Sequence, residues 1–581
     1  MAATLPSVNP SPAWADPAAD GPARLQWRIL DTDFGGGLQF LTDWAAWRND
    51  ARRPRLLHVV AVLAQVPTAD ALRAAATARP ELAALAAQLA AQWHGLLPGF
   101  HRLSFEGGRV LLTLCVGELQ AILRAQHFEA DGIRLSAASA QPDVVLKAVA
   151  RFARHGTQLI AAPSAAPSPG ALAQAGFQRV SSSVASAGLH AVFDPPWTVR
   201  RRAPIAPAAQ PAHCAVIGAG LAGAAVAASL ARRGWHVTAF DAEAPAAGAS
   251  GLPVGLLAPH VSPDDALLSR LTRAGIRATW QQLEQWLVEG RDWSACGVLE
   301  RRDLGLDEPA DTRLPSGWSA DGPNESWQAG AAQLQAAGLP PTTPALWHRR
   351  AGWVRPARLV NAWLAQPGIT LRSGCRIAGL QREPSGWSLR DAQGAHIAQA
   401  ERVVVAAGLD SATLVDSLPL QAVRGQVMWG HADGLPTTPV NGHGHLIANV
   451  PDDAGPLWLA GATYQRDRTD TTLNDADLQA NRERLQSLHP GAAQQLAPDF
   501  TRGAVQSWAG IRCASIDRRP LVGPVNVAGS AADDTLWVCT ALGSRGLSFA
   551  ALCAELLAAH WHAEPLPLPS RLAQALSLTR L

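Results

Sequence analysis

Three glycines and one aspartate, spaced for contact with a dinucleotide, form the most informative pattern in this 581-residue chain. Gly218, Gly220 and Gly223 lie in an uncharged, mostly apolar run, and Asp241 follows it. In this spacing the first glycine allows a tight turn, the second lets the backbone approach a pyrophosphate, and the third lets a helix pack closely on a sheet. An acid about 20 residues further on binds ribose hydroxyls. The pattern predicts a strand, a turn, a helix and a second strand, with phosphates at the helix N-terminus.

Later segments indicate that the dinucleotide is FAD. Small residues cluster at 246–251, apolar strands are expected at 401–407 and 536–541, and the second of these leads through a glycine turn into a helix at 549–560. The N-terminus of that helix could stabilise negative charge on a reduced flavin. Three glycine-marked strand ends on one cofactor fit FAD better than NAD. The residues expected to contact FAD are Gly218, Gly220, Gly223, Asp241, Ala249, Ser250, Gly251, Gly408, Gly543, Ser544, Arg545 and Gly546.

Composition restricts the class of protein. Hydrophobic residues make up 48% of the chain and the formal net charge is +2, so any nucleic-acid site must be a local patch. The seven cysteines are scattered without a CxxC pair, which argues for a reducing compartment and against a structural zinc. We therefore expect a cytoplasmic protein without a metal site.

One segment could be mistaken for a membrane span. The apolar run at 214–231 has about the right length. Its three glycines and the flanking Arg232 and Arg233 fit a soluble strand–helix unit better. The N-terminus lacks a basic start followed by an apolar core, so we also expect no secretory signal.

The length predicts more than one domain. A Pro- and Ala-rich linker at 202–211 immediately precedes the dinucleotide strand, and the Pro-rich residues 1–24 are expected to be a disordered tail. The two domains are expected at 25–205 and 212–581. Within the first domain we expect strands at 27–30, 56–63 and 109–116 and helices at 38–47 and 146–153.

Several phrases carry a family resemblance. They are Gly-Ala-Ser-Gly at 248–251, Leu-Leu-Ala-Pro-His at 256–260, Gly-Trp-Val-Arg-Pro at 352–356, Arg-Gly-Gln-Val at 424–427, Gly-Ala-Thr-Tyr at 461–464 and Ala-Leu-Gly-Ser-Arg-Gly-Leu at 541–547. Residues 212–581 resemble the D-amino-acid oxidase and glycine oxidase class of FAD proteins. Nearly the whole chain resembles the bifunctional tRNA 5-methylaminomethyl-2-thiouridine biosynthesis family. Leu252 departs from this family, which usually has Asn there, so one polar contact to FAD is expected to be missing.

The resemblance implies an α/β fold class throughout. It implies a Rossmann-like methyltransferase-type domain, followed by a two-part FAD-binding domain of the D-amino-acid oxidase type. A mixed-sheet substrate subdomain would be inserted into the second domain at roughly 290–400 and 420–510.

The resemblance also implies a reaction and a substrate-binding arginine. The substrate would be tRNA whose wobble uridine, at position 34, carries a carboxymethylaminomethyl group. FAD would oxidise the glycine methylene, and water would release glyoxylate and leave aminomethyluridine. The segment at 508–524 matches the oxidase segment whose arginine binds the carboxylate, which makes Arg512 the expected bidentate clamp. A structural salt bridge from Arg512 to Asp517 or another acid is the alternative. His260, His443 and His445 are possible pocket residues, although isolated histidines are more often ordinary core or surface residues.

The first domain resembles the methyltransferase half of the same family. The turn at 31–38, with Gly35 and Gly37, is similar to the S-adenosylmethionine loop of class I methyltransferases. Phrases at 97–101, 107–110 and 175–177 also match. This half would methylate the released amine.

Four departures from that pattern affect methyl transfer. Asp33 replaces a loop glycine and adds a side chain where the backbone should approach the ligand. The second strand ends at 62–64 without the acid that binds the ribose hydroxyls, a loss of about 1–3 kcal/mol. The family's acidic catalytic loop remains only as Asp131 and Gly132, and its N-terminal segment is replaced by the Pro/Ala tail. A further, milder change places Glu118 where an Asp might contact adenine. We expect the fold to survive as a scaffold or tRNA platform and S-adenosylmethionine binding to be impaired.

Two other functions remain open. A free glycine or sarcosine-type amino-acid oxidase would use the same FAD site and the same arginine but would ignore tRNA. A non-catalytic tRNA-binding flavoprotein would hold FAD without reducing it. We expect a monomer whose partner is the anticodon stem-loop of tRNA.

Overall fold

The computed structural model describes residues 14, 24–136, 141–180, 188–199, 208–302, 312–319, 321–322, 324–525 and 533–580. The chain divides into two compact units. The first comprises residues 1–210 and 558–573, and the second comprises 211–557 and 574–581. The sequence-based division assigns 558–573 to the oxidoreductase domain, whereas in the structure these residues pack with the first unit.

Two expected segments lie largely outside the described residues. Of the tail at 1–24, only Trp14 and Arg24 are described, and of the linker at 202–211 only the last four residues are.

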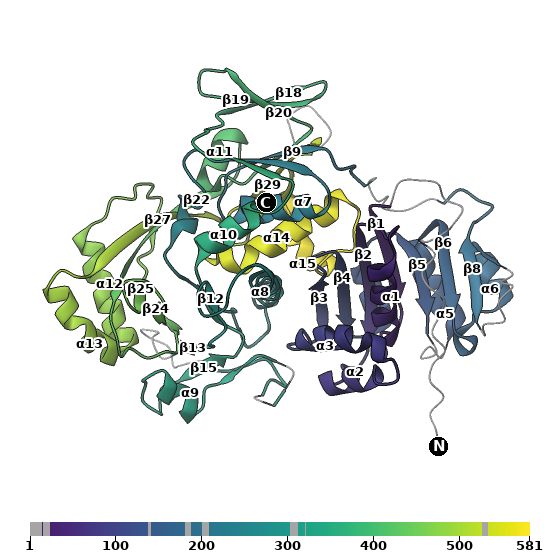
Figure 1. The fold of residues 1–581 in the computed structure, drawn as a ribbon, viewed down its shortest axis with the longest axis horizontal. Coiled ribbons are helices and arrows are strands. Elements are labelled where there is room, and N and C mark those ends of the chain that lie inside the picture. The colour runs from purple at the N-terminus through teal and green to yellow at the C-terminus, as the bar shows by residue number, and fades with distance from the viewer. Residues whose placement is uncertain are drawn as a thin grey trace. The chain divides into compact units, whose positions relative to one another are not determined.

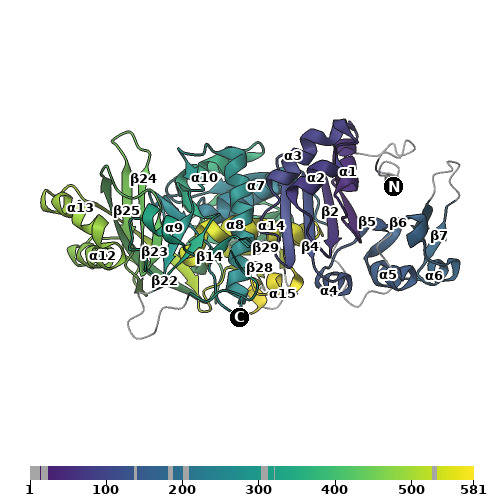
Figure 2. The ribbon, with the colours of Figure 1, turned by 90° about the horizontal axis from the view of Figure 1, so that it is seen from below.

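The first unit is a Rossmann-like mixed sheet with helices on both faces (Figures 1 and 2). Its strands are β1 (Gln26–Asp31), β2 (Leu56–Leu63), β3 (Gly99–Phe105), β4 (Val110–Val116), β5 (Ala130–Leu135), β6 (Ala153–Ala161), β7 (Phe177–Arg179) and β8 (Leu189–Phe193). Its helices are α1 (Leu38–Asn49), α2 (Ala69–Ala75), α3 (Ala83–Ala91), α4 (Leu119–Ala125), α5 (Pro142–Val149) and α6 (Pro169–Gln174). The sheet order is β3-β4-β2-β1-β5-β6-β8-β7, and β4, β2, β1, β5 and β6 are parallel. The order reverses between β1 and β5, and a ligand of such a sheet binds at the carboxyl ends of the strands that flank this point.

Alternating side chains of the central strands fill two separate cores. Ile29 and Val59 pack with apolar residues of α1 and α3 on one face, whereas Leu30 and Val60 pack with those of α4 and α5 on the other. The expected strands at 27–30, 56–63 and 109–116 and the helix at 38–47 are confirmed to within two residues. The helix expected at 146–153 is misplaced by about four residues because Pro142, which suits a first helical turn, begins it.

The C-terminal segment is bound to this first sheet by hydrogen bonds to its backbone. Arg28 donates to the Ala563 carbonyl at 3.0 Å, and Arg102 donates to the Pro565 carbonyl at 2.7 Å. Ser570, which begins α15 (Ser570–Gln574), donates to the backbone of the first unit at 2.7 Å.

The second unit contains the predicted dinucleotide fold. Its six-stranded sheet has the order β17-β10-β9-β21-β29-β28, in which only β28 is antiparallel to its neighbour. The strands are β9 (His213–Ile217), β10 (His236–Phe240), β17 (Ile369–Arg372), β21 (Arg402–Val405), β28 (Leu521–Val525) and β29 (Asp533–Thr540). The associated helices are α7 (Leu221–Arg232), α8 (Leu267–Trp286), α10 (Pro356–Leu364), α11 (Ser411–Leu414) and α14 (Gly546–Trp561).

A buried ion cluster fixes the apolar helix α7 against α14. Glu555 accepts hydrogen bonds from Ser229, Arg232 and Arg233 at 2.7–3.0 Å. Although burial opposes its charge, the two arginines hold the pKa of Glu555 well below its usual range. In the described part of the chain, no helix has both the length and the apolar character needed to cross a membrane.

A second, nine-stranded sheet forms the subdomain that the resemblance assigns to the substrate, and it is called the substrate sheet below. Its order is β14-β15-β13-β23-β24-β25-β22-β26, with β27 also paired to β22. Its strands are β13 (Val298–Arg301), β14 (Ser326–Gln328), β15 (Ala345–His348), β22 (Leu420–His431), β23 (Val440–Gly442), β24 (Gly444–Val450), β25 (Leu457–Gly461), β26 (Gln465–Arg466) and β27 (Gln506–Ser515). Its helices are α9 (Ala331–Ala336), α12 (Asp475–Leu488) and α13 (Pro490–Thr501). Two three-stranded sheets complete the unit: β11 (Gly255–Leu257), β12 (Trp293–Ser294) and β16 (Gly352–Val354), and β18 (Gly379–Glu383), β19 (Gly386–Arg390) and β20 (His396–Ala400).

The first inserted segment is shorter than the roughly 290–400 that the resemblance implies. Strands between 298 and 348 join the substrate sheet, but α10 then packs on α7 and β17 joins the dinucleotide sheet. The second segment of this sheet runs from 420 to 515. Helices α12 and α13 cover one face of the substrate sheet (Figure 1). The opposite face packs against Val254 and Trp353.

Candidate active site

The glycine-marked strand ends meet at one edge of the dinucleotide sheet. Strands β9, β21 and β29 are parallel neighbours, so their carboxyl ends lie together. Gly218 follows β9 with φ +102, and a β-carbon there would collide with the Ala406 carbonyl at the end of β21. Gly408 and Gly543 adopt φ of +59 and +58 in the turns that follow β21 and β29. The predicted convergence therefore exists.

The N-terminus of α7 has the donors that a pyrophosphate needs. The Leu221 N–H is bonded to Ser250 Oγ at 3.0 Å, whereas the N–H groups of Ala222 and Gly223 make no hydrogen bond to any residue that the structure describes. A β-carbon at Gly223 would collide with the Gly218 carbonyl, so this close helix–turn contact requires glycine. Unpaired donors at a helix N-terminus are the expected environment for phosphate.

Asp241 lies where a ribose could reach it. Its carboxylate accepts hydrogen bonds from Ala219 N–H at 2.7 Å and Glu243 N–H at 3.0 Å. Each carboxylate oxygen has a second lone pair, so both can also accept from ribose hydroxyls. The residues present therefore fit FAD.

The edge of the dinucleotide sheet at which these strand ends meet is called the cofactor edge below. Strand β27 places Arg512 near this edge. It contacts three short helical turns that carry predicted cofactor residues, namely Ala249–Gly251, Gly408–Asp410 and Gly543–Arg545. Trp508 packs in the apolar cluster between the nine-stranded sheet and the β11–β12–β16 sheet, and a β-carbon at Gly251 would lie 4.0 Å from its Nε1. Side chains an even number of residues apart on a strand share a face, so Arg512 lies on the same side as Trp508. Arg512 therefore lies on the face of β27 that is directed toward the cofactor edge.

Two glycines make room for the side chains of Arg512 and Trp508. Gly425 of β22 and Gly510 of β27 are register partners. A β-carbon at Gly425 would collide with the Arg512 guanidinium, and one at Gly510 would collide with the Trp508 ring. Both side chains therefore lie flat over a bare patch of backbone.

The arginine has the properties of a carboxylate clamp. Asp517, its predicted alternative partner, instead accepts hydrogen bonds from Arg519 at 2.9 Å and Arg580 at 2.8 Å. Arg512 donates weakly to the Thr463 carbonyl at 3.4 Å and forms no ion pair with a described residue. Burial lowers the pKa of the Arg512 guanidinium, which remains a cation that gains from an anionic ligand.

Two of the three histidines lie near the predicted arginines. His445, in β24 on the same face as the apolar cluster, neighbours Arg512, and burial together with that positive charge lowers the pKa of His445 to about 4. Burial and Arg545 lower the pKa of His260. Both are neutral near pH 7, so they can accept hydrogen bonds. His443 is exposed between β23 and β24.

Other residues contribute to the site without having been predicted individually. Trp508, Gly425 and Tyr464 lie in sequence phrases that carry the resemblance, but their roles depend on the pairing of β22 with β27. Leu252, the departure from the family pattern, packs in the apolar cluster with Val254. Ser544 is exposed at the turn before α14.

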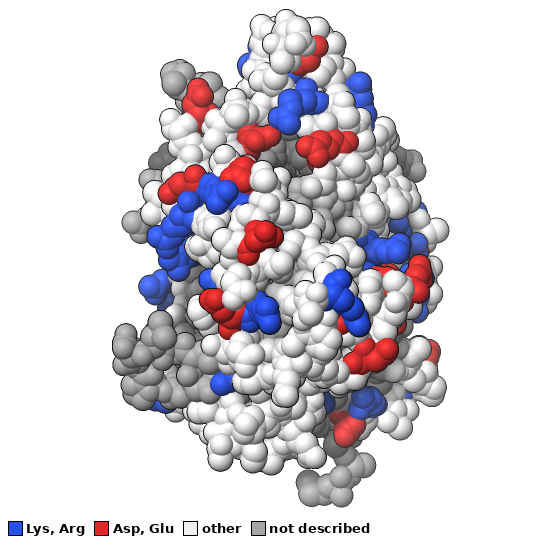
Figure 3. Space-filling model, turned by 90° about the vertical axis from the view of Figure 1, so that its left-hand side faces the viewer, with Lys and Arg blue, Asp and Glu red and all other residues white. Residues whose placement is uncertain are grey.

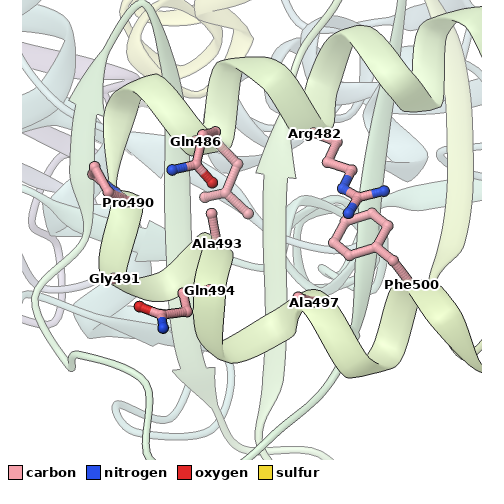
Figure 4. Close-up of a pocket in the computed structure, with 9 residues that line it drawn as sticks. Arg482, Gln486, Pro490, Gly491, Ala493, Gln494, Ala497 and Phe500 are labelled. Atoms are coloured by element: carbon pink, nitrogen blue, oxygen red, sulfur yellow. The ribbon is translucent and has the colours of Figure 1, made fainter.

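A separate surface groove lies between α12 and α13 (Figure 4). Its volume is about 350 Å³, and it is lined by Arg482, Leu485, Gln486, Pro490, Gly491, Ala493, Gln494, Ala497 and Phe500. The Arg482 guanidinium lies 5.0 Å from the centre of the Phe500 ring. None of the predicted FAD residues lines this groove. Among the described residues, no group of three His, Cys, Asp or Glu side chains could hold a metal ion.

The corresponding edge of the first unit is occupied by charged side chains. At the carboxyl end of β5, Arg134 forms a buried two-point ion pair with Asp43 of α1, one contact being 2.7 Å. The same guanidinium lies 4.0 Å from Asp31 at the end of β1. Burial, partly offset by Arg134, raises the pKa of Asp31 to about 7.

In the glycine turn that follows β1, Asp33 stabilises the backbone. Gly35 and Gly37 have φ of +54 and +76, and Asp33 accepts a hydrogen bond from Gly35 N–H at 3.0 Å. The interpretation of Asp131 as part of a remnant catalytic loop is wrong. Asp131 is the second residue of β5, where its buried carboxylate is bonded to Arg28 and Arg154.

Comparisons with known proteins agree with this organisation. The family model "DAO: FAD dependent oxidoreductase" matches residues 213–560. The tRNA 5-methylaminomethyl-2-thiouridine biosynthesis bifunctional protein MnmC of Polaromonas naphthalenivorans (strain CJ2) is 48% identical, over 95% of this chain and 90% of its own. The protein of the same name from Verminephrobacter eiseniae (strain EF01-2) is 48% identical over 96% of both chains. Glycine oxidase from Geobacillus kaustophilus shares the fold, with a TM-score of 0.50 and 22% identity over 63% of this chain and 98% of that one.

These findings confirm the α/β class, the resemblance and FAD as the cofactor. The chain belongs to the MnmC family of tRNA 5-methylaminomethyl-2-thiouridine biosynthesis bifunctional proteins, and its residues 213–560 form an FAD-dependent oxidoreductase.

Proposed function

We propose that the second unit oxidises the carboxymethylaminomethyl group of the wobble uridine, at position 34, in tRNA. The products are glyoxylate and 5-aminomethyluridine or its 2-thio form. The observation that carries this proposal is Arg512, a largely buried cation without an ion-pair partner among the described residues, directed toward the FAD edge. The names of the relatives support tRNA as the substrate.

The residues of the chain would bind and orient the glycine arm. FAD, held by the glycine turns and the α7 N-terminus, supplies the two-electron oxidation of the methylene. Arg512 would bind the carboxylate through two parallel N–H donors, which fixes the direction of the arm. Neutral His445 and His260 could accept hydrogen bonds from the amine, which must be uncharged to be oxidised. The flat Trp508 ring would exclude water from one side.

Reduction of bound FAD by modified tRNA tests this function. Anaerobic mixing with tRNA that carries the carboxymethylaminomethyl group should bleach the flavin absorbance and release one glyoxylate per flavin. Tested in parallel, free glycine and sarcosine should bleach it far more slowly. Rapid bleaching by the free amino acids alone would favour an amino-acid oxidase, and no bleaching by any of them would favour a non-catalytic flavoprotein.

We further propose that the methylation step is impaired in this chain. Arg134 pairs with Asp43 and lies 4.0 Å from Asp31 at the switch point where the adenosyl ligand would bind. The strand end at 62–64 offers no carboxylate for the ribose, and Glu118 uses its own carboxylate to cap α4 through two 2.7 Å hydrogen bonds. Titration calorimetry of the full-length protein with S-adenosylmethionine should detect no binding tighter than ~100 µM. Tighter binding, or methylated product, would contradict this proposal.

A further inference from the structure

Tyr464 occupies an unusual position beside the carboxylate clamp. It is the only tyrosine in the chain, and 49% of its surface is exposed. It directly follows Thr463, whose carbonyl oxygen lies 3.4 Å from Arg512 Nη1. Its hydroxyl is an electrostatic neighbour of both Arg512 and Arg545. A half-exposed ring beside two largely buried arginines lies between the interior of the site and solvent.

The length of the substrate arm determines where the base must lie. Four single bonds separate the carboxyl carbon from the uracil ring, a distance of about 5 Å when the arm is extended. If Arg512 binds the carboxylate, the uracil ring lies about 5 Å from it toward solvent, in the region of Tyr464. Proteins that read single-stranded RNA stack unpaired bases on aromatic side chains.

The turn between β27 and β28 places an arginine at the same entrance. Arg518 and Ile516 are exposed, Ile516 by 77%, while Asp517 between them is held by Arg519 and Arg580. Arg518 is an electrostatic neighbour of Arg545 and forms no ion pair with a described residue. It is therefore available to a phosphate.

The surface charge agrees with a protein that binds RNA through a few local contacts. On the face shown in Figure 3, Lys and Arg side chains are interspersed with Asp and Glu side chains and form no field of one sign. The net charge of +2 likewise provides no general attraction for RNA. Individual residues at the entrance must then position the nucleotide.

We propose that Tyr464 stacks on the uracil ring of the wobble nucleotide and that Arg518 contacts a neighbouring phosphate. This inference rests on the proposed oxidation of modified tRNA. It assigns the specificity for a nucleotide over a free amino acid to two residues that are not among those expected to contact FAD.

The test compares modified tRNA with N-ethylglycine, which has the glycine arm but no base. For Tyr464→Ala, the ratio of kcat/KM for tRNA to that for N-ethylglycine should fall by about 5- to 150-fold, the range for one lost base stack. Tyr464→Phe should keep the wild-type ratio because the ring remains. Arg518→Ala should weaken tRNA binding and reduce the slope of log affinity against log salt by about 1. Trp286→Ala, which removes an exposed aromatic residue at the far end of α8, is the matched control and should change neither quantity.

Bound FAD and the melting temperature are measured for every variant, so that misfolding is recognised. Equal losses for Tyr464→Ala and Tyr464→Phe would refute stacking, as would an unchanged ratio in Tyr464→Ala or an equal loss on both substrates. An unchanged salt slope in Arg518→Ala would refute the phosphate contact. If wild-type flavin is reduced by N-ethylglycine but not by modified tRNA, the proposed function itself fails, a result distinct from the loss of stacking in a variant.

Discussion

Replacement of Gly425 by alanine should displace the carboxylate clamp without touching it chemically. In the structure a β-carbon at this position would collide with both terminal nitrogens and the central carbon of the Arg512 guanidinium. Strand β22 is hydrogen-bonded to β25 on one side and β27 on the other, so its backbone has little freedom to move away. The guanidinium must therefore leave its place over the glycine.

The expected cost follows from the bonds that are lost. A hydrogen bond to a charged group contributes about 1.5–3 kcal/mol, which corresponds to about 10- to 150-fold in kcat/KM. Arg512→Lys should cause a loss in the same range, because an ammonium cannot form the two parallel bonds. Neither change affects the residues expected to hold FAD, so flavin content should stay near one per chain.

Stopped-flow reduction of bound flavin by modified tRNA or N-ethylglycine measures this effect. Gly379→Ala in β18 is the matched control, because a β-carbon there would make only an ordinary contact, 3.9 Å from Arg390 Cβ. A normal KM in Gly425→Ala with flavin retained would refute the clamp geometry. Loss of flavin in Arg512→Lys would instead assign Arg512 to the cofactor site.

Three further substitutions test the carboxyl-end edges of the two parallel sheets, one in each unit. Gly223→Ala should yield colourless protein, because its methyl group would collide with the Gly218 carbonyl; a variant that still copurifies with FAD would contradict this. Arg134→Ala should lower the free energy of unfolding by about 3–5 kcal/mol by leaving Asp43 buried without its partner, and Arg134→Ala combined with Asp43→Leu should regain most of it, as measured by denaturant titration. Asp31 keeps its proton in the folded state up to a pKa of about 7 but loses it near ~4 when unfolded, so wild-type stability should fall as pH rises through this window. The melting temperature of Asp31→Asn, relative to that of wild type, should therefore be higher at pH 8 than at pH 5. An equal difference in melting temperature at the two pH values would contradict the raised pKa.

The convergence of the glycine turns at one edge of the dinucleotide sheet could be predicted from the sequence because its determinants are local. Gly218, Gly220 and Gly223 each meet a requirement of a single turn and the helix that follows it, so spacing alone carries the information. The later turns at Gly408 and Gly543 could be assigned to the same edge because parallel strands present their carboxyl ends together. The strand at 56–63 is equally clear from the sequence, since seven of its eight residues are apolar, which indicates a central strand.

The rest of the site depends on pairing between distant strands. The space that Gly425 leaves for Arg512 exists only in the observed register of β22 with β27, which separates these residues by 87 positions in the chain. The interpretation of Asp131 as part of a loop is wrong for a similar reason. An acid followed by glycine suggests a loop, but its partners Arg28 and Arg154 come from neighbouring strands and allow the carboxylate to be buried within β5. Contacts of this kind leave no pattern in a single sequence.

The two units differ in how polar groups are paired at the carboxyl ends of their parallel strands. In the second unit, glycines at the strand ends leave helix N–H groups without partners, and those donors gain from an incoming phosphate. In the first, Arg134 and Asp43 satisfy one another, and burial raises the pKa of Asp31 to about 7. Side chains that already satisfy one another gain less from a ligand at that edge than unpaired donors do. This difference in pairing, rather than a difference in fold, is the physical reason for our proposal that S-adenosylmethionine binding is impaired in the first unit.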